Sequence, residues 1–81
     1  MNLVYQNVRK VATRNKVKLI EDLYPNPKTI LDYGCGTGEF LNAMKVNNWN
    51  CKGIEPSLKA REMAIKNYSL NINEPNALQI F

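Results

Sequence analysis

The stretch ILDYGCGTGEFL, residues 30–41, decides how this chain folds. It begins with a short, mostly apolar run that is typical of a buried strand, and it ends at the start of an amphipathic helix. Between the two stand three glycines at alternate positions, Gly34, Gly36 and Gly38. Because glycine has no Cβ, such a turn can adopt left-handed backbone and approach a ligand closely. The stretch therefore predicts a strand–turn–helix unit whose turn binds a ligand.

Helices and strands are expected to alternate on both sides of this unit. Pro25 and Pro27 should end a leading helix, in which the polar residues 13–18 leave room for a bend. This order predicts an α/β fold, a Rossmann-like, doubly wound, mostly parallel sheet in partial form behind an N-terminal helix. We expect two parts, a helical cap over 1–27 and a ligand-binding part over 28–81. The expected elements are a helix over 3–24, a strand over 28–33, a helix over 39–46, a strand over 49–55, a helix over 58–67 with Ser57 as its N-cap, and a short strand within 68–73.

Length and composition restrict the classes of protein. The chain has 81 residues and a mass of 9.3 kDa, of which 44% are hydrophobic, so we expect one small soluble domain or part of one. No apolar run approaches the roughly 20 residues of a membrane-spanning helix. With no histidine and two cysteines, a Cys/His zinc finger and histidine acid–base chemistry are excluded, and we expect no metal site. Two cysteines also favour reduced thiols and a cytoplasmic location.

The net charge of +4 is confined to the N-terminal part of the chain. Residues 1–28 carry six basic and two acidic side chains, whereas residues 29–81 carry five of each. Such an excess can attract an acidic substrate or nucleic acid, although a solvated helix face is the commoner explanation. No aromatic residues interleave with these basic ones, so nothing supports base stacking.

The residues around the glycines argue against a phosphate ligand. A P-loop needs Lys and then Ser or Thr after its last glycine, but Gly38 is followed by Glu39 and Phe40. Glu39 also stands where the dinucleotide fingerprint has its third glycine, and its charge at a helix start would repel a pyrophosphate. Asp32 adds a second negative charge before the turn. An acidic turn suits a cationic ligand, such as the methionyl end of S-adenosylmethionine with its sulfonium and ammonium groups.

A second acid follows at the end of the next expected strand. Glu55 lies 21 residues after Gly34, about the separation at which a Rossmann-type acid reaches a ribose. We expect its carboxylate to accept hydrogen bonds from the 2′- and 3′-hydroxyls, and Pro56 to lie against the adenine.

Residues 14–73 resemble the N-terminal part of a class I S-adenosylmethionine-dependent methyltransferase. Residues 32–38, DYGCGTG, resemble the first motif of that family, and residues 51–57, CKGIEPS, resemble the next one. The resemblance implies a seven-stranded sheet, of which this chain covers about the first half, and a leading helix that covers the cofactor or shapes the acceptor pocket. It implies methyl transfer from S-adenosylmethionine to an unidentified acceptor, with S-adenosylhomocysteine as product. The expected cofactor-binding residues are Asp32, Tyr33, Gly34, Cys35, Gly36, Gly38, Glu55 and Pro56.

Other interpretations stay open. The chain could be half of an NAD-type dehydrogenase, which Glu39 disfavours, or a non-catalytic cofactor-binding or interaction module. A nucleic-acid-binding module through the basic N-terminal helix lacks a base-reading motif. No catalytic residue can be assigned. An open sheet edge, where later strands of the family belong, would favour self-association.

Overall fold

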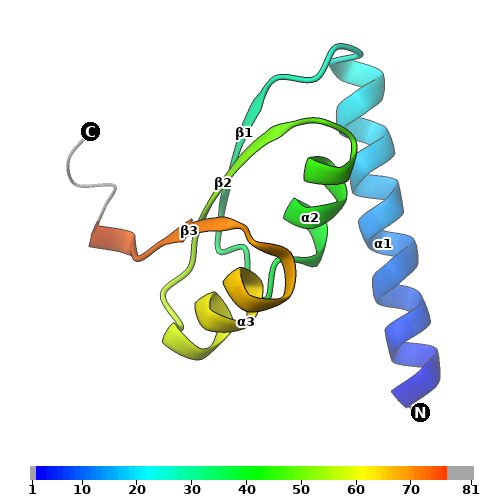
Figure 1. The fold of residues 1–81 in the computed structure, drawn as a ribbon. Coiled ribbons are helices and arrows are strands. Elements are labelled where there is room, and N and C mark those ends of the chain that lie inside the picture. The colour runs from blue at the N-terminus through cyan, green and yellow to red at the C-terminus, as the bar shows by residue number, and fades with distance from the viewer. Residues whose placement is uncertain (1, 77–81) are drawn as a thin grey trace.

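The computed structural model describes the backbone of residues 2–76 and the side chains of residues 13–76. Helices and strands alternate, and the three strands form one parallel sheet in the order β1-β2-β3 (Figure 1). This confirms the predicted α/β class. The predicted division of the chain at residue 27 stays a prediction. The elements are α1 (Asn2–Leu23), β1 (Thr29–Tyr33), α2 (Glu39–Val46), β2 (Asn50–Ile54), α3 (Leu58–Tyr68) and β3 (Asn71–Asn73).

The leading helix is continuous. No bend or second helix replaces α1 across the polar residues 13–18, because Val17 and Ile20 still reach the core and hold this part of the helix in place. The helix packs against α2 and lies at the side of the molecule, beyond α2 from the sheet (Figure 1). None of the described helices is long and apolar enough to cross a membrane.

The boundaries of α2 and α3 follow local sequence signals. Asn48 adopts a positive φ of 72° just after α2, as expected for a C-terminal stop. The hydroxyl of Ser57 accepts the N–H of Ala60 at 3.3 Å, which confirms Ser57 as the N-cap of α3.

The third strand is shorter than the alternation over 68–73 predicts. The helix α3 continues to Tyr68, and Ser69 ends it in the left-handed region with its N–H on the carbonyl of Ile65. Leu70 is therefore buried in the connection, and β3 spans only three residues. No helix or strand is predicted over residues 77–81, which lie outside the described residues.

The core lies between the sheet and the helices α2 and α3. Gly53 of β2 faces this core, and a Cβ there would lie 2.6 Å from Ile72 and 2.8 Å from the Cys35 sulfur. Only glycine therefore fits, and the glycine turn and β3 both pack closely on β2. The buried hydrophobic cluster consists of Leu41, Met44, Trp49, Cys51, Ala64, Leu70 and Ile72.

Candidate functional site

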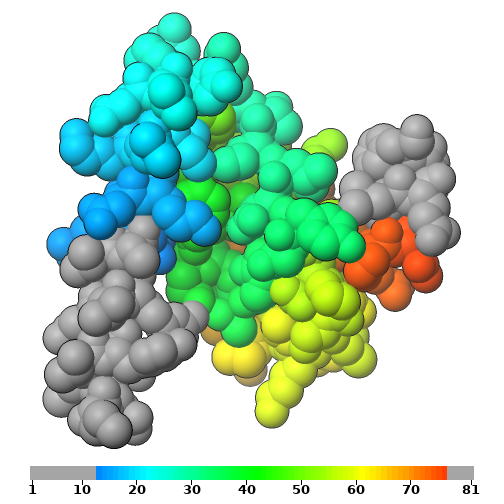
Figure 2. All heavy atoms as spheres, turned by 180° about the vertical axis from the view of Figure 1, so that it is seen from behind, coloured from blue at the N-terminus to red at the C-terminus, as the bar shows by residue number. Residues whose placement is uncertain are grey.

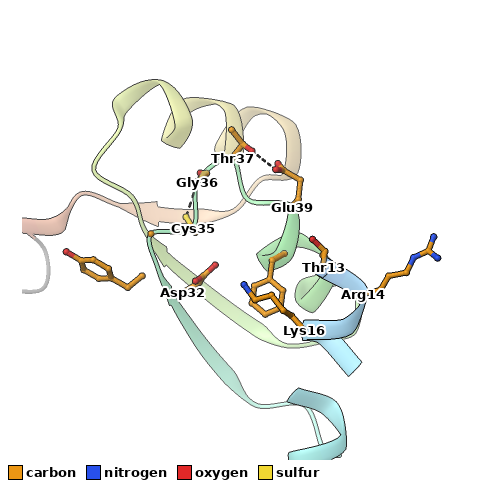
Figure 3. Close-up of a pocket in the computed structure, with 11 residues that line it drawn as sticks. Thr13, Arg14, Lys16, Asp32, Cys35, Gly36, Thr37 and Glu39 are labelled. Atoms are coloured by element: carbon orange, nitrogen blue, oxygen red, sulfur yellow. Dashed lines mark hydrogen bonds between the residues drawn. The ribbon is translucent and has the colours of Figure 1, made fainter. Parts of the chain in front are cut away.

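A pocket of about 710 Å³ lies where β1 ends, between the glycine turn and α1. Its size is within the range of sites for small organic ligands. From behind, α1 in blue borders the green residues of the turn and of α2 (Figure 2). The pocket is lined by Thr13, Arg14, Lys16, Asp32, Tyr33, Gly34, Cys35, Gly36, Thr37, Glu39 and Phe40 (Figure 3).

The glycine turn is held by backbone hydrogen bonds to the end of β2. The N–H groups of Gly34 and Cys35 both donate to the carbonyl of Ile54, at 2.7 and 3.2 Å. All three glycines of the turn have positive φ values, namely 79°, 59° and 92° along the chain. At Gly38 space is limiting as well, because a Cβ there would lie 2.6 Å from the Leu70 side chain. Glycine is therefore favoured at Gly34 and Gly36 by the backbone conformation, and at Gly38 it is also required by the lack of space.

Asp32 is a half-buried carboxylate on the pocket wall. Among the described side chains it forms no hydrogen bond or ion pair. Burial raises the pKa of this carboxyl group, and the positive charge of Lys16 opposes that shift. An acid that is partly desolvated and lacks a protein partner is suited to receive a cationic or hydrogen-bond-donating ligand.

Lys16 brings a positive charge from α1 to the same pocket. Its ammonium lies 4.6 Å from the centre of the Phe40 ring, a cation–π contact that fixes the end of the side chain. It reaches toward the side of the pocket that holds Asp32, whereas Arg14 extends away from it (Figure 3). Asp32 and Lys16 thus place a negative and a positive group on the same side of the pocket.

Glu55 follows β2 and is 8% exposed. One carboxylate oxygen accepts the N–H of Gly36 at 2.7 Å, and the other accepts the N–H of Ser57 at 2.8 Å. The side chain is therefore bonded to the back of the glycine turn, and Glu55 does not belong to the lining of the pocket.

Cys35 is a poor candidate for a nucleophile. Burial raises the pKa of its thiol to about 11, and the negative charges of Asp32 and Glu55 add to that rise. A helix N-terminus can lower the pKa of a nearby thiol, but burial and the two acids outweigh the start of α2 here. The thiol therefore stays protonated at neutral pH, as a small packing group within the turn.

The structure gathers most of the predicted cofactor residues in one place. Asp32, Tyr33, Gly34, Cys35 and Gly36 line the pocket. Gly38, Glu55 and Pro56 lie outside its lining, and the contacts predicted for them with a cofactor stay predictions. Six further residues line the pocket and were not predicted as cofactor-binding residues: Thr13, Arg14, Lys16, Thr37, Glu39 and Phe40. Lys16 and Phe40 resemble ordinary helix residues in the sequence, and only the packing of α1 on α2 brings Lys16 to the turn.

Two solved structures share this fold at low sequence identity. A TehB-like SAM-dependent methyltransferase from Corynebacterium glutamicum superposes with a TM-score of 0.68 at 19% identity, over 90% of this chain and 43% of that one. A protein from Pyrococcus horikoshii superposes with a TM-score of 0.64 at 18% identity, over 84% of this chain and 30% of that one. This chain thus spans less than half the length of either. A search of curated proteins gives no significant match.

The two structures show a shared fold, whereas a sequence profile identifies the family. The profile of a methyltransferase domain matches residues 5–79, which include the leading helix, the glycine turn and Glu55. That span is nearly the whole chain, and it agrees with the parallel α/β order and with the pocket at the end of β1. The chain therefore belongs to the methyltransferase domain family.

Proposed function

We propose that this chain is the cofactor-binding portion of an S-adenosylmethionine-dependent methyltransferase. It would hold S-adenosylmethionine at the glycine turn for methyl transfer to an acceptor. S-adenosylhomocysteine would occupy the same pocket as the product.

Asp32 is the observation that carries this proposal. It is half-buried, it lines the pocket, and among the described side chains it has no hydrogen-bonding or ionic partner. A carboxylate in this position favours a ligand that supplies positive charge and N–H donors. The ammonium group of S-adenosylmethionine has both properties, whereas a pyrophosphate would be repelled by Asp32.

The positive charge of Lys16 fits the same ligand. The methionyl end carries a carboxylate as well as an ammonium, and Lys16 offers a positive group opposite Asp32. We propose that the turn, with Tyr33, Gly34, Cys35 and Gly36, contacts this end of the cofactor. Gly38 lies outside the pocket lining and lets the turn pack closely against Leu70. Pro56 would lie toward the adenine.

The bound cofactor would supply a methyl group that its positive sulfur already activates. The residues of the chain then need to bind, orient and desolvate the reacting groups, rather than to provide a strong base. No residue of the pocket is assigned as a base.

Calorimetric titration of the chain with S-adenosylmethionine, S-adenosylhomocysteine and NAD tests the proposal. We expect both adenosyl ligands to bind at one site and NAD to bind much more weakly. Asp22→Asn, which changes an exposed acid that pairs with Lys18, is the matched control for Asp32→Asn. Tight NAD binding without a response to either adenosyl ligand would contradict the proposal.

A cofactor-binding module without catalysis is the second candidate. The chain covers only 43% and 30% of the two similar structures, so it lacks counterparts for much of their length. Incubation with labelled S-adenosylmethionine and candidate acceptors distinguishes the two candidates, because methyl transfer by this chain alone excludes the module.

We also propose a cytoplasmic location, which is supported by the two cysteines being free thiols.

We propose, in addition, self-association through the free edge of β1. It is supported by the exposure of Leu31 and Tyr33 on this strand, at 51% and 62%. Light scattering on the purified chain would show whether it is a dimer or a monomer.

A further inference from the structure

The carboxylate of Glu55 is buried, and each of its oxygens accepts a hydrogen bond from the backbone. The residue is 8% exposed, and its two oxygens accept the N–H groups of Gly36 and Ser57 at 2.7 and 2.8 Å. A buried carboxylate is tolerated where hydrogen bonds of this kind replace water. These two bonds use donors that belong to the backbone, so they form without any ligand.

The two N–H groups belong to different parts of the site. Gly36 is in the middle of the glycine turn, where the chain passes the pocket. Ser57 is the N-cap of α3, on the far side of the β2 end. One side chain thus joins the turn to the start of α3. The bond to Gly36 adds to the two bonds that Gly34 and Cys35 donate to the carbonyl of Ile54, and it is the one that connects the turn to α3.

Arg61 strengthens the same junction from α3. Its guanidinium donates to the carbonyl oxygens of Glu55 at 2.7 Å and of Pro56 at 3.1 Å. The backbone that carries Glu55 is therefore fixed to α3 while the carboxylate is fixed to the turn. This arrangement gives the carboxylate a defined position before any ligand arrives.

We infer that Glu55 is a positioning residue, which sets the shape of the glycine turn in the ligand-free chain by holding Gly36 to the start of α3. Its effect on the cofactor then passes through the turn and does not require a contact with the ribose hydroxyls. This inference depends on the proposed function only for the identity of the ligand that the turn binds. The bonds to Gly36 and Ser57 can be tested without one.

Amide hydrogen exchange on the ligand-free chain, followed by NMR, is the first test. In the unmodified chain we expect both amides to be protected from exchange. Glu55→Gln keeps the shape of the side chain, but its terminal NH₂ group cannot accept a hydrogen bond. At least one of the two amides should therefore exchange about tenfold faster or more in this variant.

Two control variants distinguish the loss of the Glu55 hydrogen bonds from a general destabilisation of the fold. Glu62→Gln removes the charge of an exposed acid on α3 and should leave both amides unchanged. Ser57→Ala removes the hydroxyl that caps α3 but keeps the N–H that Glu55 holds, so Gly36 should stay protected.

A second test compares S-adenosylhomocysteine with its 2′,3′-dideoxyribose analogue by calorimetry. If Glu55 acts through the turn, Glu55→Gln should weaken binding of both ligands by a similar factor of about ten. If Glu55 acts as a ribose ligand alone, the variant should weaken only the ligand that has the hydroxyls.

Faster exchange at Gly36 or Ser57 together with a loss of affinity for both ligands supports the inference. Unprotected amides in the unmodified chain, amides unchanged by Glu55→Gln, or a loss that vanishes with the dideoxy analogue would overturn it. If neither ligand binds the unmodified chain, the proposed function fails, and the exchange measurement still decides whether Glu55 holds the turn.

Discussion

The ends of β1 and β2 lie side by side, and each carries an acid in a different state. Asp32 of β1 is half-buried, lines the pocket and has no partner among the described side chains. Glu55, directly after β2, is buried and accepts two backbone N–H groups. The same chemical group can therefore be available to a ligand at one strand end and committed to the fold at the next. Neighbouring N–H groups, rather than residue type, make this difference.

The largest expected effect is on the stability of the fold at the β2 end. Glu55→Ala leaves the part-buried N–H groups of Gly36 and Ser57 without their acceptor, which should cost about 1–3 kcal/mol in the free energy of unfolding. Urea denaturation followed by circular dichroism measures it. Glu62→Ala is the exposed control, and equal stability of the two variants would show that Glu55 does not hold the turn.

The next effect is on binding at the β1 end. Asp32→Asn should weaken binding of S-adenosylhomocysteine by more than about tenfold, because a neutral amide loses the charge that attracts the ammonium group. Calorimetry measures the affinity, with Asp22→Asn as control. Unchanged affinity in Asp32→Asn would place the cationic end of the ligand elsewhere.

Lys16→Met should have a smaller effect on the same site. It removes the cation–π contact with Phe40, worth about 0.5–1 kcal/mol, and it removes the positive charge opposite Asp32. We expect affinity for S-adenosylhomocysteine to fall by about threefold to fivefold and the pKa of Asp32 to rise further. NMR titration of the carboxyl group measures the second effect, and an unchanged or lower pKa would show that the charge of Lys16 does not act on Asp32.

The smallest effect is the pH dependence of stability. Burial raises the pKa of Asp32 in the folded chain above the ordinary value of an aspartate, so ionisation of this group disfavours the folded state. Its favourable contribution is complete below the pKa of the unfolded chain and is lost as the pH rises through the folded pKa. Asp32→Asn should therefore raise the midpoint of thermal unfolding at pH 7, on the order of 2 °C. A lower midpoint in this variant would show that the ionised carboxylate stabilises the fold.

Local signals in the sequence predicted most of the fold. The glycines at 34–38, the prolines at 25 and 27 and the cap at Ser57 each act on neighbouring backbone, so their effects can be read from adjacent residues. The start of β3 could not be predicted this way, because the left-handed Ser69 that delays it has no characteristic sequence signal.

Only the part of the site that lies in one continuous segment of the sequence was predicted. Asp32 and the glycines belong to one continuous motif, whereas Lys16 reaches the pocket through the packing of α1 on α2. The environment of Glu55 depends on Gly36, 19 residues before it, so the sequence indicated an acid at a strand end but not its hydrogen-bond partners. Gly53 was missed for a similar reason, since its need for glycine comes from Ile72 and Cys35.

The most direct test of the different roles of the two acids is a paired measurement on Asp32→Asn and Glu55→Gln. For each variant, the free energy of unfolding without ligand and the affinity for S-adenosylhomocysteine are determined on the same preparation. We expect Asp32→Asn to lose affinity with no loss of stability, and Glu55→Gln to lose both. Asp32→Asn that destabilises the fold while retaining affinity, or Glu55→Gln that loses affinity with its stability intact, would contradict this account.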